Sequence, residues 1–188
     1  MSHLSRCILA ASYLVAMAGC ASLPPPTEAP APGAPFQRDV PETTLLVLHR
    51  RLSLRQLWTE ADGLVAEVDR AIEASGLKRT GPLQMLYVGC KGDPEELFDY
   101  EVGFPVEAAS SDPPAGLSWR KAAAFSCLAV RHVGSMVDCR STYASLYRSL
   151  FFSRRAPSGE NREVYTRWEG FASDRTETEI QVGLRPVR

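Results

Sequence analysis

From residue 43 onward the sequence repeats one order of patterns, and this repeat limits the possible folds more than any other feature. In the first copy, residues 44–51 form a short apolar run, and residues 57–72 then place apolar side chains at helical spacing. Residues 83–90 and 97–106 follow as two further strand-like runs separated by a turn. The first half therefore predicts a βαββ unit.

The second copy gives the same order. Residues 122–132 predict a strand, and residues 156–161 predict a loop. Residues 162–169 and 178–184 predict the last two strands. The helix between the first strand and the loop has one face marked by Tyr143, Leu146, Tyr147 and Leu150.

Two sequence echoes favour a true internal repeat. Tyr87 precedes a glycine by five positions, as Tyr165 does, and the Val-Gly pair at 102–103 is matched at 182–183. The alternative is chance likeness between two ordinary hairpins. We expect an α+β domain with pseudo-two-fold symmetry, in which halves of about 43–109 and 117–188 form an antiparallel sheet. Two helices would cover one face, with a central groove between them.

The N-terminal segment predicts export. Arg6 precedes an apolar run at residues 7–18 that is too short to span a bilayer as a helix. Small residues then lead to Cys20, and this arrangement resembles the lipobox of bacterial lipoproteins. The resemblance implies that residues 1–19 are a signal peptide and that Cys20 is acylated. The alternative is an ordinary secretory signal that happens to contain a cysteine.

The segment after Cys20 predicts a tether. Residues 23–35 are rich in proline and poor in core-forming residues, which is typical of an extended, semi-rigid spacer. We therefore assign residues 20–42 to an anchor and tether and residues 43–188 to the folded domain. By resemblance to Gram-negative lipoproteins, Ala21 implies an outer-membrane lipoprotein of the cell envelope that faces the periplasm.

Three cysteines remain once Cys7 has left with the signal and Cys20 is acylated. In an oxidising compartment, Cys90, Cys127 and Cys139 predict either one disulfide and one buried thiol or three buried thiols. No metal-site spacing is present, so we expect no metal and no cofactor. The formal net charge of -1 gives no field that attracts nucleic acid, and we expect no nucleic-acid partner.

Glu163 is the residue that departs from the repeat. Alignment on Tyr87 and Tyr165 sets it opposite Met85, on the face that should carry apolar side chains toward the helices. A carboxylate in that position is costly unless it is paired or lines a solvated cavity. One interpretation pairs it with Arg131 or Arg167; the other makes it the acid of a pocket for a flat or cationic molecule. The candidate pocket residues are Glu163, Tyr165, Tyr87, Tyr100, Phe98, Tyr143, Tyr147 and Trp168.

These motifs together resemble one family. Gly81-Pro82 with Tyr87, the run at 97–106, His132-Val133-Gly134 before the second helix, and the strands around 162–165 and 178–180 are similar to the GyrI-like (gyrase-inhibitor-like) domain. This domain also serves as the effector-binding part of AraC- and MerR-type regulators. The resemblance implies a small-molecule groove with Glu163 as its acid and Tyr165 and Tyr87 as walls. Where the family often has Gly-Pro-Tyr, this chain has Gly134-Ser135-Met136, and Ser135 is a candidate helix N-cap.

The function expected from these observations is a membrane-anchored binding module for a small hydrophobic or cationic molecule. Its partners would be that molecule and, through Cys20, the lipid bilayer. Two alternatives stay open: a small hydrolase acting on an electrophilic small molecule, or an envelope interaction protein with a filled groove. Only one acid is visible on the covered face, so the sequence favours a binding module over an enzyme.

Overall fold

The computed structural model describes residues 33–107 and 112–186. The expected signal peptide, Cys20 and most of the tether lie outside the described residues. The elements in chain order are β1 (Phe36–Val40), β2 (Thr43–Leu52), α1 (Leu54–Ala74), β3 (Leu83–Val88), β4 (Phe98–Pro105), β5 (Ser118–Ala122), β6 (Phe125–Val133), the short 3₁₀ helix η1 (Met136–Asp138), α2 (Arg140–Phe152), β7 (Pro157–Arg167) and β8 (Glu177–Leu184).

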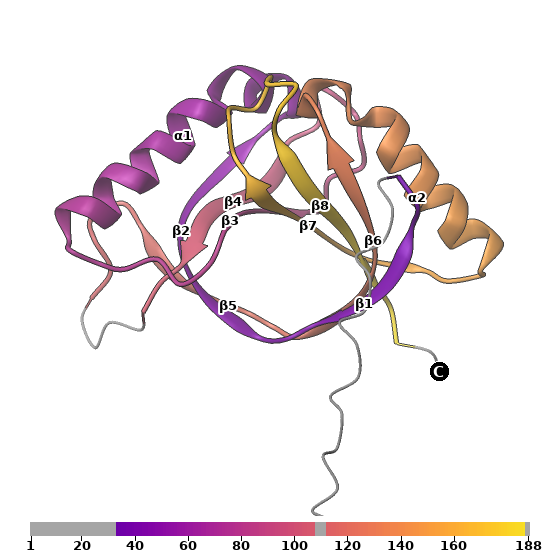
Figure 1. The fold of residues 1–188 in the computed structure, drawn as a ribbon, viewed down its shortest axis with the longest axis horizontal. Coiled ribbons are helices and arrows are strands. Elements are labelled where there is room, and N and C mark those ends of the chain that lie inside the picture. Colours follow the sequence, from indigo (N-terminus) through magenta and orange to yellow (C-terminus); the bar gives the residue numbers. More distant parts are fainter. Residues whose placement is uncertain (1–32, 108–111, 187–188) are drawn as a thin grey trace, which may run out of the picture.

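The strands form one antiparallel sheet in the order β1-β6-β8-β7-β3-β4-β2-β5 (Figure 1). Helix α1 packs on β2 and β4, and α2 packs on β6, so both helices cover the same face of a curved sheet. This α+β architecture confirms the predicted fold class. The central neighbours, β3 and β7, come from different halves of the chain.

The two edge strands were not predicted. Strand β1 starts at Phe36, inside the segment that we assigned to the tether, and pairs with β6 of the second half. Strand β5 belongs to the second half but pairs with β2 of the first. The halves therefore exchange their edge strands, and the folded part begins upstream of residue 43. The predicted loop at residues 156–161 is also wrong, because β7 begins at Pro157, where it pairs with Leu184 before a bulge.

Local signals explain both helices. Ser53 and Gln56 form a reciprocal capping box at the start of α1, and Ser75 and Gly76 end it, with Gly76 at a positive φ. Ser135 does act as an N-cap, but of η1 rather than of α2, because its hydroxyl accepts the backbone N–H of Val137. Cys139 is the cap residue of α2 and makes no side-chain cap bond.

The register at the centre of the sheet places Met85 directly opposite Glu163 on β3 and β7. Leu83 pairs with Tyr165 and Tyr87 with Asn161, so the Met85–Glu163 pair lies midway between these two pairs on the antiparallel ladder. The Val-Gly echo does not correspond in space, because Met85 pairs with Val102 whereas Glu163 pairs with Ile180, not Val182. The internal duplication stays a prediction.

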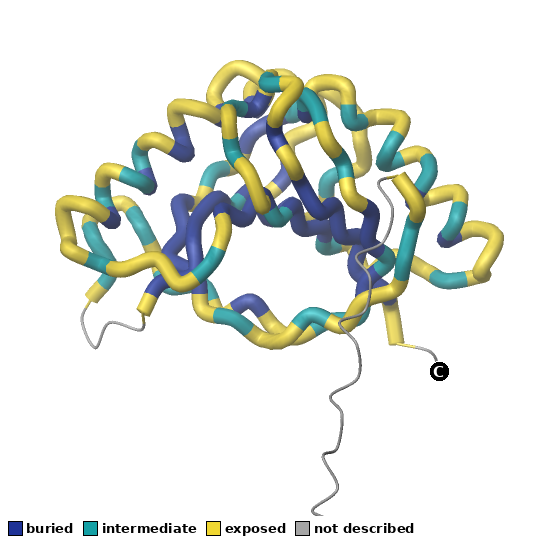
Figure 2. Tube along the Cα trace, in the orientation of Figure 1, coloured by how far each residue is buried: buried dark blue, intermediate teal, exposed yellow. Residues whose placement is uncertain are grey.

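The core lies between the sheet and the two helices (Figure 2). Its strand residues include an alternating set on each of two strands: Phe98, Tyr100, Val102 and Phe104 on β4, and Ile180, Val182 and Leu184 on β8. Asp99 and Glu101 point away from this core toward His49 and Arg120 respectively. Alternation along the strands therefore fixed which side chains face the helices.

Cys90, Cys127 and Cys139 are free thiols; Cys127 is buried and the other two are half-buried. The described residues thus contain three unpaired cysteines and no disulfide. Within residues 33–107 and 112–186, no helix is long and apolar enough to cross a membrane. The same residues contain no cluster of three or more His, Cys, Asp or Glu side chains suited to a metal ion.

Candidate functional site

Glu163 is a buried carboxylate on the helix-facing side of the sheet. Its side chain is 2% exposed, and its cross-strand neighbours are Met85 and Ile180, both fully buried and apolar. Arg167 pairs instead with Glu169 and Glu177, and Arg131 is exposed and does not pair with Glu163. Among the described residues no lysine or arginine forms an ion pair with Glu163. The arginine partner considered from the sequence is therefore absent from the described part of the chain.

Three tyrosine hydroxyls take the place of a cation. Tyr87 on β3 donates to Oε2 of Glu163 at 2.5 Å, and Tyr165, two residues along β7, donates to the same oxygen at 2.6 Å. Tyr143 on α2 donates to Oε1 at 2.7 Å. Three elements thus hold the carboxylate in one orientation.

Burial and hydrogen bonding act on Glu163 in opposite directions. Desolvation raises the pKa of its carboxyl above the ordinary range, because burial penalises the charged form. The hydroxyls of Tyr165, Tyr87 and Tyr143 and the nearby His132 act to lower that pKa, and burial outweighs them. Burial and the neighbouring carboxylate together raise the pKa of each of the three tyrosines well above 10, so these hydroxyls remain donors.

A cavity of about 600 Å³ opens over this carboxylate. Its floor is Glu163, Tyr87 and Asn161, and its walls come from the start of α1, the segment after β3, and α2. The groove is therefore not filled by side chains. The residues that line it are Leu54, Leu57, Trp58, Tyr87, Cys90, Lys91, Gly92, Pro94, Met136, Val137, Cys139, Arg140, Tyr143, Ala144, Tyr147, Asn161, Glu163 and Phe171.

The predicted site residues divide into two groups. Glu163, Tyr87, Tyr143 and Tyr147 line the cavity. The other four, Tyr165, Tyr100, Phe98 and Trp168, do not line it and support those that do. Phe98 stacks on Tyr87 and Trp168 packs edge-on against Tyr165.

Tyr100 belongs to the supporting group. It is fully buried, and its ring meets Tyr87 edge-on at 5.5 Å between ring centroids. Its hydroxyl has no hydrogen-bond partner in the described part of the chain. Burial, with Glu163 nearby, raises the pKa of Tyr100 well above 10.

Several lining residues were missed by sequence reasoning. Trp58 on α1 is 40% exposed and stands at the rim, and Phe171 closes the cavity from the segment after β7. Arg140 at the start of α2 also lines the cavity. An exposed tryptophan on an otherwise amphipathic helix was the available signal for Trp58. No local pattern places Arg140 or Phe171 at the site.

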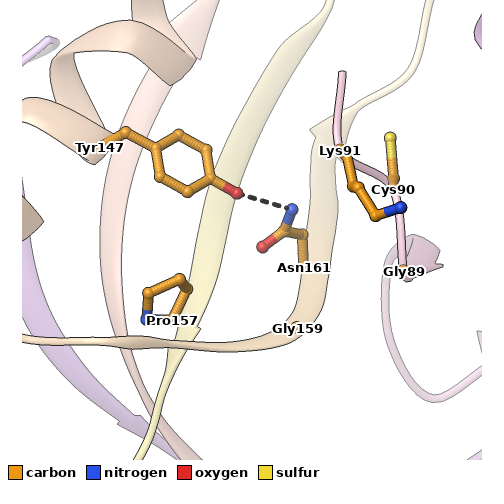
Figure 3. A pocket seen from close by; sticks show the side chains of 7 residues that line it. All are labelled: Gly89, Cys90, Lys91, Tyr147, Pro157, Gly159 and Asn161. Atoms are coloured by element: carbon orange, nitrogen blue, oxygen red, sulfur yellow. Dashed lines mark hydrogen bonds between the residues drawn. The ribbon is translucent and has the colours of Figure 1, made fainter. Parts of the chain in front are cut away.

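A second cavity of about 480 Å³ adjoins the first and shares four lining residues with it: Cys90, Lys91, Tyr147 and Asn161. Gly89, Pro157 and Gly159 complete it (Figure 3). In Figure 3 the amide of Asn161 donates to the hydroxyl of Tyr147 at 3.3 Å, between β7 and α2. This bond joins β7 to α2 at two residues that line both cavities.

The arrangement suits binding better than a reaction. The cavity offers aromatic and aliphatic walls with one preoriented carboxylate, which is the usual composition of a site for an apolar or cationic organic molecule. Burial raises the pKa of the Cys139 thiol in its wall to about 12 and also raises the pKa of Cys90, which favours the neutral thiol in both.

Comparison with known families agrees with this geometry. A family model described as GyrI-like small molecule binding domain matches residues 34–185, so the chain belongs to the GyrI-like family. The match begins next to β1 and ends just after β8, which includes both edge strands. No curated protein matches the chain.

Solved structures share the fold at low sequence identity. The crystal structure of the EcmrR C-terminal domain is similar with a TM-score of 0.70 and 18% identity, covering 82% of this chain and 98% of that one. SAV2435, solved bound to tetraphenylphosphonium, has a TM-score of 0.58 and 12% identity, covering 81% and 94%. A hydrolase from Listeria innocua has a TM-score of 0.53 and 10% identity, covering 82% and 93%.

Proposed function

We propose that this chain is a membrane-anchored binding module that holds a small hydrophobic or cationic molecule in the groove between its two halves, with Glu163 as the buried acid. The observation that carries the proposal is a carboxylate held by three hydroxyls and facing a cavity of about 600 Å³ without a cationic partner in the described residues. The family assignment supports the small-molecule class of ligand.

A lipophilic cation satisfies this site best. Its charge would compensate the ionised carboxylate in a setting of low dielectric constant, where an opposite charge has most effect. Its apolar groups would pack against Trp58, Tyr147 and the leucines of α1 that line the cavity. Two other cationic side chains line the cavity, and neither pairs with Glu163. Lys91 is paired with Glu96, and Arg140 is exposed to solvent.

The anchoring part of the proposal rests on the sequence around Cys20. An acylated cysteine and a proline-rich spacer would keep the domain beside the outer membrane on its periplasmic side. A binding module in that position would capture lipophilic molecules within the envelope.

The binding claim is tested with tetraphenylphosphonium as probe, by isothermal titration calorimetry at neutral pH. Glu163→Gln keeps the size of the side chain and removes its charge, and we expect it to weaken binding at least about ten-fold, or roughly 1.4 kcal/mol. Glu177→Gln makes the same change at an exposed glutamate and should leave the affinity unchanged. Equal affinity for Glu163→Gln and the parent, or no heat of binding to either, would refute the proposal.

A further inference from the structure

The end of α2 exposes two adjacent phenylalanines. Phe151 is 79% and Phe152 75% exposed, and their rings touch edge-on at 5.7 Å between centroids. Arg148 lies on the same helix just before the pair, and Arg154 and Arg155 follow it in the sequence. We call these five residues the α2 patch; Figure 2 colours the C-terminal end of this helix mostly as exposed. Adjacent, nearly fully exposed phenylalanines on a water-soluble surface indicate a contact surface.

The charge of this segment is one-sided. Residues 140–159 contain four arginines and no aspartate or glutamate, in a chain whose formal net charge is -1. Within the described parts of the chain, Arg140, Arg148, Arg154 and Arg155 form no ion pair, whereas eight of the other twelve arginines there do. The positive charge of the α2 patch is therefore available to an outside partner.

Backbone geometry adds a second observation. Arg154 has a φ of 54°, and among the described residues it is the only non-glycine residue with a positive φ. It occupies the position after the C-cap of α2, where its N–H binds the carbonyl of Phe151 and the N–H of Arg155 binds that of Leu150. Glycine is the usual residue at this position of a helix end. An arginine there puts a long cation beside the phenylalanines at a conformational cost.

The α2 patch continues the rim of the cavity. Arg140, Ala144 and Tyr147 line the cavity, and Phe151 follows Tyr147 by four residues on the same face of α2. Leu146 and Leu150 face the core instead. Whatever covers the α2 patch therefore also lies next to the mouth of the cavity.

We propose that the α2 patch docks on an anionic phospholipid surface and so turns the mouth of the cavity toward the lipid. Arginines at the polar edge and aromatic rings on the apolar side are the composition that places a helix in the interface of a bilayer. The long arginine side chains reach headgroup phosphates while the phenylalanines enter the acyl boundary. A second copy of the chain fits less well, because a two-fold contact would bring arginines against arginines.

This inference is independent of ligand binding and of the anchor at Cys20. The test uses the full chain with vesicles of phosphatidylglycerol and phosphatidylcholine, the latter brominated to quench tryptophan fluorescence. Phe152→Trp reports on the α2 patch, and Arg70→Trp places the same reporter at an exposed position of α1. Both variants carry the same N-terminal segment, so attachment through that segment contributes equally to both.

We expect lipid quenching of the fluorescence added by Phe152→Trp and little quenching of that added by Arg70→Trp. Replacing Arg148, Arg154 and Arg155 by glutamine in the Phe152→Trp chain should cut the quenching by roughly half or more, as should vesicles without phosphatidylglycerol. Equal quenching at the two positions would overturn the proposal. The proposal would also be overturned if the emission of the tryptophan at position 152 shifted to the blue without vesicles and the shift grew with protein concentration. That result would mean that a second copy of the chain covers the α2 patch.

Discussion

Glu163 carries opposing free-energy terms of similar size. Removing a carboxylate from water costs several kcal/mol even after relaxation of the protein. Hydrogen bonds to a charged group return about 1.5–3 kcal/mol each, and Glu163 accepts three. The hydroxyls therefore make the buried acid tolerable, while burial still raises its pKa. A bound cation would shift this balance further toward the ionised form.

This balance predicts how stability depends on pH. Because the folded-state pKa of Glu163 lies above its unfolded value, the unfolded chain releases this proton first as the pH rises. The contribution of Glu163 to stability is therefore greatest below about pH 4 and falls as the pH rises through the folded-state pKa. We expect the unfolding free energy of the parent, relative to that of Glu163→Gln, to decrease between pH 4 and pH 7 in urea titrations. A difference that grows with pH would contradict a raised pKa.

The alternation of side chains along β3 and β7 was enough to predict that Glu163 lies on the helix-facing side of the sheet. Its position two residues before Tyr165, on a strand whose partner carries Met85, placed the acid among apolar side chains. Tyr143 was predicted as a pocket residue, but its hydrogen bond to Glu163 was not, and the rim residues Trp58 and Arg140 were not predicted at all. They reach the site from helices whose placement over the sheet depends on packing rather than on local sequence.

At the scale of elements, periodicity predicted both helices and the six inner strands, and it failed at the sheet edges. Strands β1 and β5 have five residues each and alternate little, because each is an edge strand that buries few side chains. Each also pairs with the opposite half of the chain, and nothing in a short segment predicts such an exchange. The start of β7 was missed because Pro157, Ser158 and Gly159 are typical of a loop, and a bulge accommodates them.

Alanine substitutions at two glycines test two different effects on stability: helix propensity at Gly63 and close packing between strands at Gly103. A Cβ at Gly103 on β4 would lie 2.0 Å from the carbonyl oxygen of Leu46, whereas a Cβ at Gly63 on α1 would meet nothing within 4 Å. We expect Gly63→Ala to raise the unfolding free energy by about 0.5–1 kcal/mol, because alanine favours the helix. Gly103→Ala should lower it by about 2 kcal/mol or more, because β2 and β4 must separate.

Chemical denaturation of the two variants beside the parent measures both effects, and each serves as the control for the other. Destabilisation by Gly63→Ala, or no loss in Gly103→Ala, would show that the two glycines are placed differently from the structure described above.

At the scale of the whole molecule, the proposed function rests on an unequal pair of residues at the centre of the sheet. Counted inward from either edge of the sheet, the strands of one half occupy the positions that those of the other half occupy from the opposite edge. At the centre, Met85 on β3 lies opposite Glu163 on β7. The two helices lie to either side of this centre (Figure 1), and both contribute residues to the lining of the cavity. In the proposed function, the single carboxylate fixes the orientation of the bound molecule by attracting its positive charge to Glu163.

The most direct test of this account is the titration of the Glu163 carboxyl carbon by ¹³C NMR, with and without tetraphenylphosphonium. We expect the pKa of Glu163 to lie above its ordinary range in the free protein and to fall when the cation binds, because the opposite charge stabilises the carboxylate. An ordinary pKa in the free protein, or a pKa that saturating cation leaves unchanged, would contradict the assignment of Glu163 as the acid of the binding site.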